Sequence, residues 1–302
     1  MAEKAIEERI QELKKARHAV ILSHNYQRGE VQDIADFVGD SLELSQKAAQ
    51  TQAEVIVFCG VHFMAETAFI LNPHRKVLLP DAHAGCPMAN MITAEQLRQK
   101  KSEMPGVTVV TYINSTAAVK AESDYCCTSA NGVKVVQSIK SDNILFVPDQ
   151  YLGDFISRRT GKKMALWPGY CPTHMRILPE DIIRQKKEHP GAKVVVHPEC
   201  RPEAIALADE AASTSGMVRY AARPDVRELI VGTEVELLHR LHKENPGKKF
   251  YPVSDKAVCP NMKLITLEKV LQSLETMTPE VKVPEDIRVK AKAAVDRMLA
   301  IV

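Results

Sequence analysis

The sequence predicts an α/β protein with three similar αβα domains, each a parallel sheet with helices on both faces. Three observations lead to this prediction. A Cys-Pro pair recurs about every 85 residues, a short apolar strand precedes each pair, and apolar strands alternate with amphipathic helices throughout. Such alternation is typical of parallel sheets whose strands are joined by helices. A repeat of this length indicates duplicated domains rather than a solenoid of small units.

The three Cys-Pro pairs occupy the same position in each repeat. They are Cys86-Pro87, Cys171-Pro172 and Cys259-Pro260, which lie 85 and 88 residues apart. Each pair follows a basic residue, a short apolar run and a loop, and these runs begin at Lys76, Lys163 and Lys249. Equivalent positions of three repeats meet at the centre of an assembly with pseudo-threefold symmetry. We therefore expect Cys86, Cys171 and Cys259 to form one central site.

The predicted elements follow the repeat. A helix over 3–17 opens the chain, with Ile6, Ile10 and Leu13 at helical spacing. Each repeat then starts with a short β-branched run, typical of a parallel strand buried on both faces. These first strands cover 19–23, 107–111 and 193–196, the second strands cover 55–58, 143–147 and 228–231, and the third strands lead to the cysteines.

Predicted helices link these strands. They cover 64–71, 92–103, 152–160, 179–189 and 234–243, and two more, over 264–276 and 284–299, end the chain. Pro105-Gly106 and Pro190-Gly191 lie at equivalent places before the second and third repeats and mark turns there. The predicted domains are residues 1–90, 91–176 and 177–262, with the C-terminal helices of 263–302 joining the first domain.

A second set of residues repeats in the same register. The first strands end at His24, Tyr112 and His197, and a hydroxyl residue follows each of them after 17 residues, at Ser41, Ser129 and Thr214. Ser and Thr favour helix N-caps, and helix N-termini bind anions. Ligands of parallel α/β domains lie beyond the carboxyl ends of the strands. A single such hydroxyl is usually only a cap, but three in register predict a shared anion-binding site.

Composition limits the class of protein. The chain has 302 residues, 45% of them hydrophobic, and a net charge of +2, which gives no reason to expect a nucleic-acid partner. The first ten residues lack a signal-peptide core, and no apolar run reaches the roughly 20 residues of a membrane span. These features predict a soluble, cytoplasmic protein without a membrane partner. Seven cysteines, an odd number, favour thiols that are reduced or bind metal.

The three repeated cysteines suggest a metal centre. Structural zinc prefers four ligands, commonly in closely spaced cysteine pairs, and the sequence has no Cys-x₂₋₄-Cys pair. Three thiolates from three domains suit an iron–sulfur cluster with one iron free of protein ligands, which can act as a Lewis acid. The alternative is a buried thiol that serves only as a small apolar group. We prefer that alternative for Cys59, Cys126 and Cys127.

Nine motifs together identify a family resemblance. The chain resembles quinolinate synthase from end to end in the segments 23–26, 39–41, 84–89, 112–115, 127–131, 169–174, 197–200, 213–217 and 258–262. The resemblance implies three αβα domains around a [4Fe-4S] cluster held by three cysteines. It also implies condensation of iminoaspartate with dihydroxyacetone phosphate to quinolinate, two waters and phosphate in de novo NAD biosynthesis. L-aspartate oxidase or aspartate dehydrogenase would supply the imine. Some relatives carry a redox-active Cys-x-x-Cys beside the last ligand, which Cys259-Pro-Asn-Met262 lacks.

The resemblance also implies the site residues. Around the substrate it places His24, Ser41, Tyr112, Ile113, Asn114, Ser129, His174, His197, Pro198, Glu199 and Thr214. The candidates for proton transfer are Tyr26, Tyr112, His197 and Glu199. His174, three residues after Cys171, suits support of that ligand as well as substrate contact. We expect partial burial to raise the pKa of Glu199 towards the working pH; the alternative is a surface Glu199 paired with Arg201.

Two other classes of function stay open at this point. A hydro-lyase could use the same open iron on a hydroxy acid and would need no phosphate site. A non-enzymatic iron–sulfur sensor or carrier would need no anion pocket, so the three hydroxyl residues in register argue against it.

Overall fold

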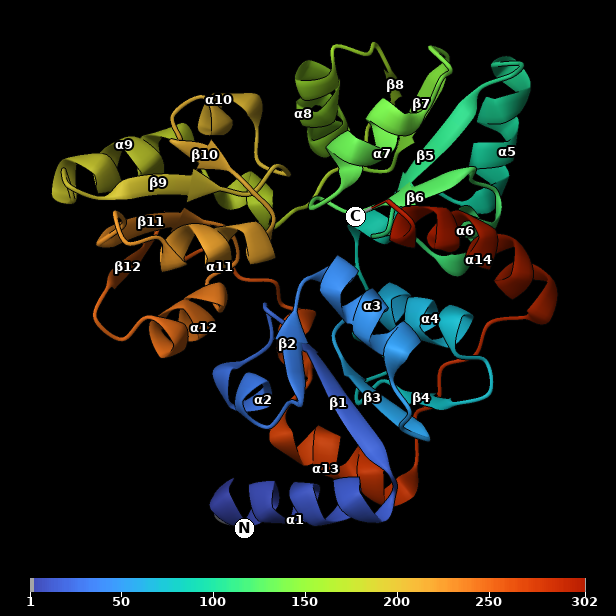
Figure 1. Ribbon diagram of the computed structural model, residues 1–302, viewed down its shortest axis with the longest axis vertical. Coiled ribbons are helices and arrows are strands. Elements are labelled where there is room, and N and C mark those ends of the chain that lie inside the picture. The colour runs from blue at the N-terminus through green and yellow to red at the C-terminus, as the bar shows by residue number, and fades with distance from the viewer. Residues whose placement is uncertain (1–2, 302) are drawn as a thin grey trace.

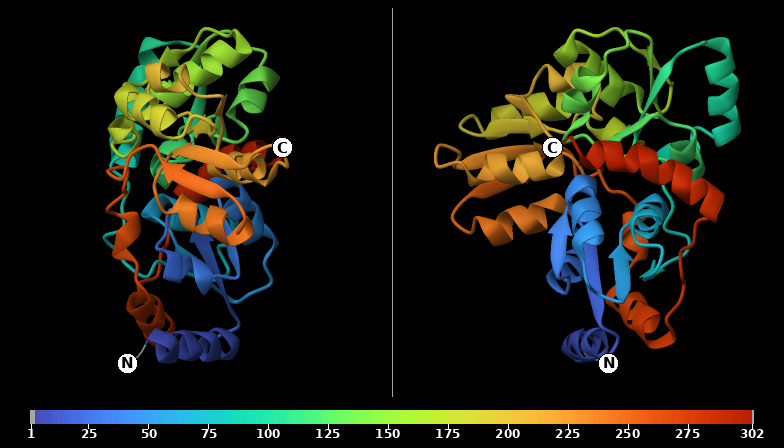
Figure 2. Two further views of the ribbon diagram at one scale, coloured as in Figure 1. Left: turned by 90° about the vertical axis from the view of Figure 1, so that its left-hand side faces the viewer. Right: turned by 45° about the vertical axis from the view of Figure 1, so that its right-hand side comes forward.

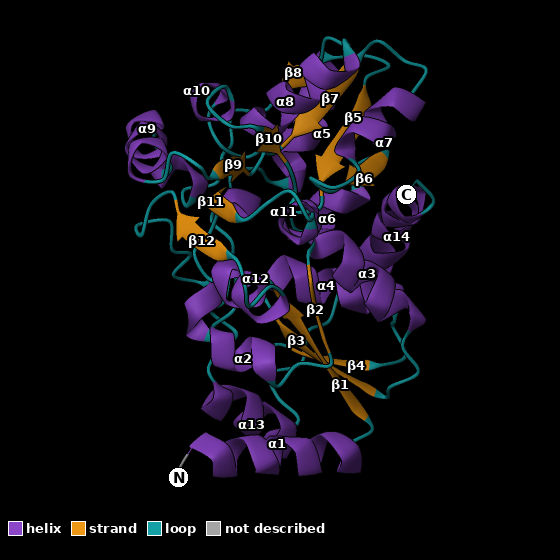
Figure 3. Cartoon of the chain, turned by 60° about the vertical axis from the view of Figure 1, so that its left-hand side comes forward, coloured by secondary structure: helices purple, strands orange, loops and turns teal. Residues whose placement is uncertain are grey.

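The computed structural model describes residues 3–301 and contains three four-stranded sheets in which all strands are parallel (Figure 1). The strand orders are β2-β1-β3-β4, β6-β5-β7-β8 and β10-β9-β11-β12, the same order three times. Helices flank each sheet, and the sheets lie around a common centre (Figures 1 and 3). The predicted fold class, an α/β protein with three similar units, is confirmed.

The first unit surrounds a strand that is buried along its whole length, β3 (Val55–Cys59). The other strands are β1 (Ala19–His24), β2 (Phe37–Gly39) and β4 (Lys76–Leu78). The helices are α1 (Glu3–Ala16), α2 (Gly29–Asp33), α3 (Ser41–Gln50) and α4 (His62–Leu71), followed by the 3₁₀ helix η1 (Met88–Asn90).

The second unit repeats this plan around β5 and β7. Its strands are β5 (Thr108–Tyr112), β6 (Tyr125–Cys127), β7 (Ile144–Val147) and β8 (Ala165–Leu166). Its helices are α5 (Ala94–Glu103), α6 (Ala117–Ala121), α7 (Gly132–Ser138) and α8 (Gln150–Thr160), and the 3₁₀ helix η2 (His174–Arg176) follows.

The third unit has two separate apolar clusters of its own, whereas one continuous cluster spans the first unit and part of the second, which has a further cluster of its own. Its strands are β9 (Lys193–Val196), β10 (Glu210–Ala211), β11 (Glu228–Gly232) and β12 (Lys249–Pro252). Its helices are α9 (Pro179–Glu188), α10 (Pro202–Ile205), α11 (Thr214–Ala222) and α12 (Leu237–Glu244), and the 3₁₀ helix η3 (Met262–Leu264) follows.

Each sheet has one strand more than the sequence predicted. The additional strands are β2, β6 and β10, which have only two or three residues and pair with β1, β5 and β9 at one edge of each sheet. Such short segments cannot show the apolar run that identifies a buried strand. The sequence therefore predicted three of the four strands of each sheet, and every predicted strand is present.

The two C-terminal helices pack against different units (Figures 1 and 2). Helix α13 (Leu267–Thr276) lies against α1 and β3 of the first unit. Helix α14 (Glu285–Leu299) lies along α6 and β6 of the second unit and also touches α4. Residues 263–302 were expected to join the first domain, and of their two helices only α13 packs mainly against that unit. The predicted domain boundaries stay a prediction. Within residues 3–301, no helix has both the length and the apolar character that crossing a membrane requires.

One backbone hydrogen bond anchors each cysteine loop to its sheet. The donors lie three residues after β3, β7 and β11, and the acceptor carbonyls lie two residues before the cysteine. The pairs are His62 to Ala84 (2.7 Å), Gln150 to Gly169 (2.9 Å) and Val235 to Ala257 (3.1 Å). The same anchor in three sheets brings Cys86, Cys171 and Cys259 to equivalent places. This geometry accounts for the spacing of the cysteines along the chain.

Gly169 provides a test of this anchor. A Cβ at Gly169 would come within 2.5 Å of the Pro148 carbonyl oxygen, a backbone atom that cannot move aside easily. We expect Gly169→Ala to lower the free energy of unfolding by about 1–3 kcal/mol, as overpacking does. A Cβ at Gly191 would meet no atom within 4 Å. Gly191→Ala is therefore the control, and urea unfolding of the two variants gives the comparison; equal stability would contradict the close approach.

Candidate active site

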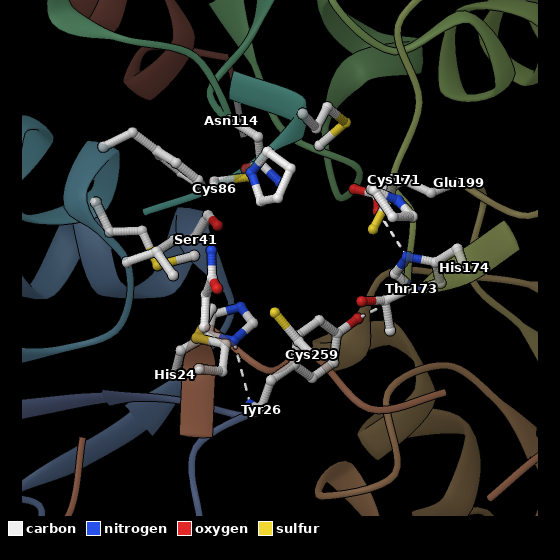
Figure 4. Close-up of a pocket in the computed structure, with 18 of the residues that line it drawn as sticks. His24, Tyr26, Ser41, Cys86, Asn114, Cys171, Thr173, His174, Glu199 and Cys259 are labelled. Atoms are coloured by element: carbon white, nitrogen blue, oxygen red, sulfur yellow. Dashed lines mark hydrogen bonds and ion pairs between the residues drawn. The ribbon is translucent and has the colours of Figure 1, made fainter. Parts of the chain in front are cut away.

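Three sulfur atoms from three loops face one central pocket (Figure 4). Cys86, Cys171 and Cys259 all line this pocket, and each is partly buried. The first follows β4, the second follows β8 and the third follows β12, so each unit contributes one thiol. The structure thus brings together the three cysteines that the repeat selected.

The environment of each sulfur is also repeated. A 3₁₀ helix begins within three residues of each cysteine. Burial raises the pKa of all three thiols, that of Cys86 to about 12. Backbone N–H groups three residues later, at Ala89, His174 and Met262, lower these pKa values. The thiols therefore stay neutral until a cation binds, and N–H groups are ready to stabilise the thiolates.

The spacing of the donor atoms bears on the type of metal centre. In residues 3–301, one group of three metal-binding side chains has its ligand atoms within 4.8 Å of one another, namely Cys171, His174 and Glu199. The three cysteine sulfurs do not approach one another that closely. A single ion therefore cannot be held by all three without movement, whereas a group of several metal atoms needs thiolates that lie further apart. The all-thiolate donor set and this spacing fit an iron–sulfur cluster.

In each unit, two residues at and just after the end of the first strand line the pocket. The strand-end residues His24, Tyr112 and His197 do so together with the residues two positions later, Tyr26, Asn114 and Glu199. In the first and third units the chain turns here, with hydrogen bonds from the Gln27 N–H to the His24 carbonyl and from the Cys200 N–H to the His197 carbonyl (3.0 Å each). The three sheets thus direct six polar side chains at one space, as the sequence predicted for the ends of the first strands.

Two of these residues are neutral histidines with a defined tautomer. Nδ1 of His24 accepts a hydrogen bond from the Tyr26 backbone N–H (3.2 Å), and Nδ1 of His197 accepts one from the Glu199 backbone N–H (3.3 Å). Burial lowers the pKa of both imidazoles to about 3. Each neutral ring therefore carries its proton on Nε2. His197 donates this proton to the Ser129 hydroxyl, 3.2 Å away.

Glu199 is buried, with 3% of its surface exposed. Its Oε1 accepts a hydrogen bond from the Tyr112 hydroxyl (2.5 Å), and its Oε2 lies 2.8 Å from Nδ1 of His174. Burial alone raises the pKa of Glu199, but His174, His197 and Tyr112 outweigh burial and lower it to about 2. The expected rise in this pKa is therefore wrong, because burial brings the carboxylate against three partners. The alternative of a surface Glu199 paired with Arg201 is also wrong.

A chain of close polar contacts joins two tyrosines through Glu199. Nδ1 of His174 faces the carboxylate, and its Nε2 forms a hydrogen bond with the Thr233 hydroxyl (2.9 Å). Thr233 then accepts from the Tyr26 hydroxyl (2.5 Å). The order is Tyr26, Thr233, His174, Glu199 and Tyr112. Burial and the charge of Glu199 raise the pKa of both phenols well above its usual value, so both remain proton donors.

The three repeated hydroxyls lie in the pocket but do not cap helices. Ser41, Ser129 and Thr214 line the pocket. The N-cap residues of α3, α7 and α11 are instead Asp40, Asn131 and Ser213, and α7 starts three residues after Ser129. The predicted capping role is wrong, and the α3 start is further occupied by a capping box of Asp40 and Glu43. Since capping does not use these hydroxyls, they are available to a ligand. The Thr214 hydroxyl also accepts a hydrogen bond from the side-chain amide of Asn25 (2.7 Å).

The pocket lining includes residues that sequence reasoning missed. Thr128, Thr173, Arg176, Val61, Phe63, Met64, Asn261 and Met262 line it as well. Most of them directly follow a strand or flank a ligand cysteine, which is the only sequence signal that could have indicated them. Two predicted substrate residues, Ile113 and Pro198, are absent from the lining. The Ile113 side chain is buried and faces a small separate cavity with Phe58.

The fold and this pocket define a three-unit α/β enzyme with a thiol-lined centre. The family model described as quinolinate synthetase A protein matches residues 8–300. A protein named quinolinate synthase from Dehalococcoides mccartyi strain CBDB1 is 65% identical to this chain over 302 residues, which cover all of both chains. Another from Desulforudis audaxviator is 59% identical over 293 residues, which cover 97% of both chains. A third from Geobacter metallireducens is 56% identical over 296 residues, which cover 98% of this chain and 97% of the relative. The chain belongs to the quinolinate synthase family, whose members are enzymes of NAD biosynthesis.

The neutral histidines predict a pH dependence of stability. Between pH 6.5 and about pH 3, His24 and His197 are protonated in the unfolded chain but neutral in the folded protein. The folded state is therefore fully stable above pH 6.5 and loses stability as the pH falls. From pH 7.5 to 5.5, each histidine should account for a loss of about 1.4 kcal/mol.

Urea unfolding of the metal-free protein at both pH values measures this loss. His24→Asn should remove about 1.4 kcal/mol of the loss and the double variant with His197→Asn about twice that. An unchanged pH dependence in the double variant would show that these rings are not buried in the neutral form.

Proposed function

We propose that the enzyme condenses iminoaspartate with dihydroxyacetone phosphate to quinolinate, two waters and phosphate. The observation that carries the proposal is the convergence of three thiols and six strand-end polar residues on one pocket. Membership of the quinolinate synthase family supports it. The chemistry needs a site for anions, proton donors and acceptors, and a group that activates a hydroxyl; each has candidates in the pocket.

Cys86, Cys171 and Cys259 would hold a [4Fe-4S] cluster. Their sulfurs face one space, they are not all within 4.8 Å of one another, and the N–H groups of Ala89, His174 and Met262 stabilise thiolates. When bound, the cluster supplies a Lewis-acidic iron without a protein ligand. His174, which is hydrogen-bonded to Thr233, suits support of the Cys171 loop as well as contact with the substrate.

Neutral donors would bind the anionic substrates. The hydroxyls of Ser41, Ser129 and Thr214 and the Nε2–H groups of His24 and His197 come from different units and line one pocket. Arg176 is the only Lys or Arg among the lining residues, and it is exposed. Carboxylates and a phosphate are therefore held mainly by hydrogen bonds, which become strong when the acceptor is charged.

Proton transfer would run through Glu199 and the two tyrosines. Each loss of water requires one group to take a proton from carbon and another to give a proton to the leaving hydroxyl. Glu199 is ionised and can accept, while Tyr26 and Tyr112 are protonated and can donate. The chain through Thr233 and His174 returns protons between them. A bound substrate carboxylate would raise the low pKa of Glu199 and make it a better base.

Phosphate release tests the reaction. Iminoaspartate, formed in the assay by L-aspartate oxidase, is mixed anaerobically with dihydroxyacetone phosphate and enzyme. One phosphate should appear for each quinolinate, and none when either substrate is omitted. Dehydration of a hydroxy acid without phosphate release would indicate a hydro-lyase instead, and absence of any turnover would indicate a sensor or carrier.

The ligand set predicts which cysteines are required. Ser in place of Cys86, Cys171 or Cys259 should remove most of the iron and the activity, because each unit supplies one thiolate. Cys126→Ser is the matched control, since Cys126 is fully buried in β6 and does not line the pocket. Iron analysis of anaerobically purified protein gives the result. Loss of iron from Cys126→Ser, with retention in Cys86→Ser, would contradict the assignment.

Glu199→Gln should lower kcat by roughly a hundredfold or more, because the amide cannot accept the proton. It should still accept the hydrogen bond from Tyr112, so iron content and folding should stay unchanged. The control is Glu203→Gln, a nearby exposed glutamate. Full activity of Glu199→Gln would exclude Glu199 as the base.

A further inference from the structure

Glu234 is a fully buried carboxylate that neither lines the pocket nor takes part in the proton chain. It follows β11, and none of its surface is exposed. Its Oε1 accepts a hydrogen bond from the Cys259 backbone N–H (3.0 Å), and its Oε2 accepts one from the Glu236 backbone N–H (3.0 Å). Nζ of Lys263 lies 2.9 Å from Oε1 and forms an ion pair with it.

Lys263 also contacts the first unit, at Tyr26. Its side chain is 13% exposed, and Nζ also donates to the backbone carbonyl of Tyr26 (2.6 Å). Its own carbonyl accepts from Nε of Arg28 (3.0 Å). One ion pair therefore joins the end of β11, the Cys259 loop and the segment that carries Tyr26, which come from distant parts of the chain.

The position of Glu234 is repeated, but its ion pair is not. One residue in each unit lies two positions after β11, β7 or β3 and immediately before the residue that anchors the cysteine loop. These residues are Glu234, Asp149 and Val61. Asp149 is buried and accepts from the N–H groups of Tyr151 and Leu152 in its own helix. Val61 has no side-chain acceptor. Among these three positions, only Glu234 links a ligand loop to another unit through an ion pair.

We propose that Glu234 and Lys263 are a positioning pair that fixes the Cys259 loop relative to Tyr26. The pair acts through the Cys259 backbone and the Tyr26 carbonyl and touches neither substrate nor sulfur. Its effect on cluster retention rests on the proposed function, whereas its effect on the loop does not. The pair keeps the ligand from the third unit and the proton donor from the first at a constant separation.

Burial makes the pair sensitive to the loss of one member. A charge that loses its partner inside a protein has a large desolvation penalty, whereas replacing both members by apolar residues is often tolerated. Glu234→Gln keeps an acceptor for the Cys259 N–H but removes the nearer counter-charge of the Lys263 ammonium and leaves only Glu236, whose Oε1 lies 3.9 Å from Nζ. Lys263→Met removes the link to Tyr26. Lys263→Arg retains the charge, so it should preserve most of the link between the Cys259 loop and Tyr26.

The first experiment measures cluster loss from the anaerobic holoenzyme in excess iron chelator, followed by visible absorbance and iron per chain. Glu234→Gln and Lys263→Met should lose the cluster about ten- to a hundredfold faster than the wild type, as expected when residues that support metal ligands are changed. Lys263→Arg should lie closer to the wild type. The control is the exposed pair Glu228 and Lys249, 3.3 Å apart, in the double variant E228Q/K249M, which should match the wild type.

The second experiment uses the metal-free protein, so it does not depend on any cluster. Iodoacetamide labelling followed by mass spectrometry gives the rate at which each cysteine reacts. In Glu234→Gln, Cys259 should react about tenfold faster relative to Cys86 than it does in the wild type, because its loop has lost an anchor. If the single variants do not fold, E234L/K263M should fold and show the same loosening. Wild-type rates of both cluster loss and Cys259 labelling in the folded variants would overturn the proposal.

If the wild-type protein binds no cluster, the proposed function fails, while the labelling rates still test the pair. If the wild-type protein holds a cluster and the variants behave like it in both experiments, the positioning pair fails and the proposed function stands.

Discussion

The structure depends on one constraint, which is that three thiols on three separate sheets must face the same small space. Each cysteine loop satisfies it with the same backbone hydrogen bond, from the third residue after β3, β7 or β11 to a carbonyl two residues before the cysteine. Because the bond forms at the same edge of every sheet, arranging the sheets around one centre brings the sulfurs together. The strand-end residues of the first strands lie at that edge too, so the same arrangement also creates the polar lining.

Burial at this centre sets the charge state of every titratable group. It keeps His24 and His197 neutral and keeps the phenols of Tyr26 and Tyr112 protonated. Glu199 is the exception, since His174, His197 and Tyr112 lower its pKa despite burial. The pocket thus holds the ionised Glu199 among neutral donors, which suits a reaction that moves protons among anionic substrates. The other carboxyl group that lines the pocket, that of Asp40, caps α3.

The sequence was informative where a physical property repeats along the chain. Buried strands are continuous apolar runs, so β1, β5 and β9 and the neighbouring β3, β7 and β11 were predicted, while β2, β6 and β10 were too short to be recognised. The threefold spacing also brought His24, Tyr112 and His197 into one site. The N-caps were misassigned because a hydroxyl beside a helix start resembles a cap, whereas Asp40, Asn131 and Ser213 make the caps.

Contacts between units explain most of what the sequence could not predict. Glu199 meets His174, Thr233 bridges Tyr26 and His174, and Glu234 meets Lys263 only after the units assemble. Local sequence carries no information about such partners. The predicted direction of the Glu199 pKa was wrong for this reason, and Thr233 was missed because nothing in its neighbours marks it.

Iron and sulfide analysis with ⁵⁷Fe Mössbauer spectroscopy tests the central claim, that three units together hold one cluster. Anaerobic protein should contain about four irons and four sulfides per chain, with one iron spectroscopically distinct because no cysteine binds it. Adding substrate should change the spectrum of that iron alone. A single metal ion per chain, held by Cys171, His174 and Glu199, would contradict the account, because that site needs only one of the three repeated cysteines.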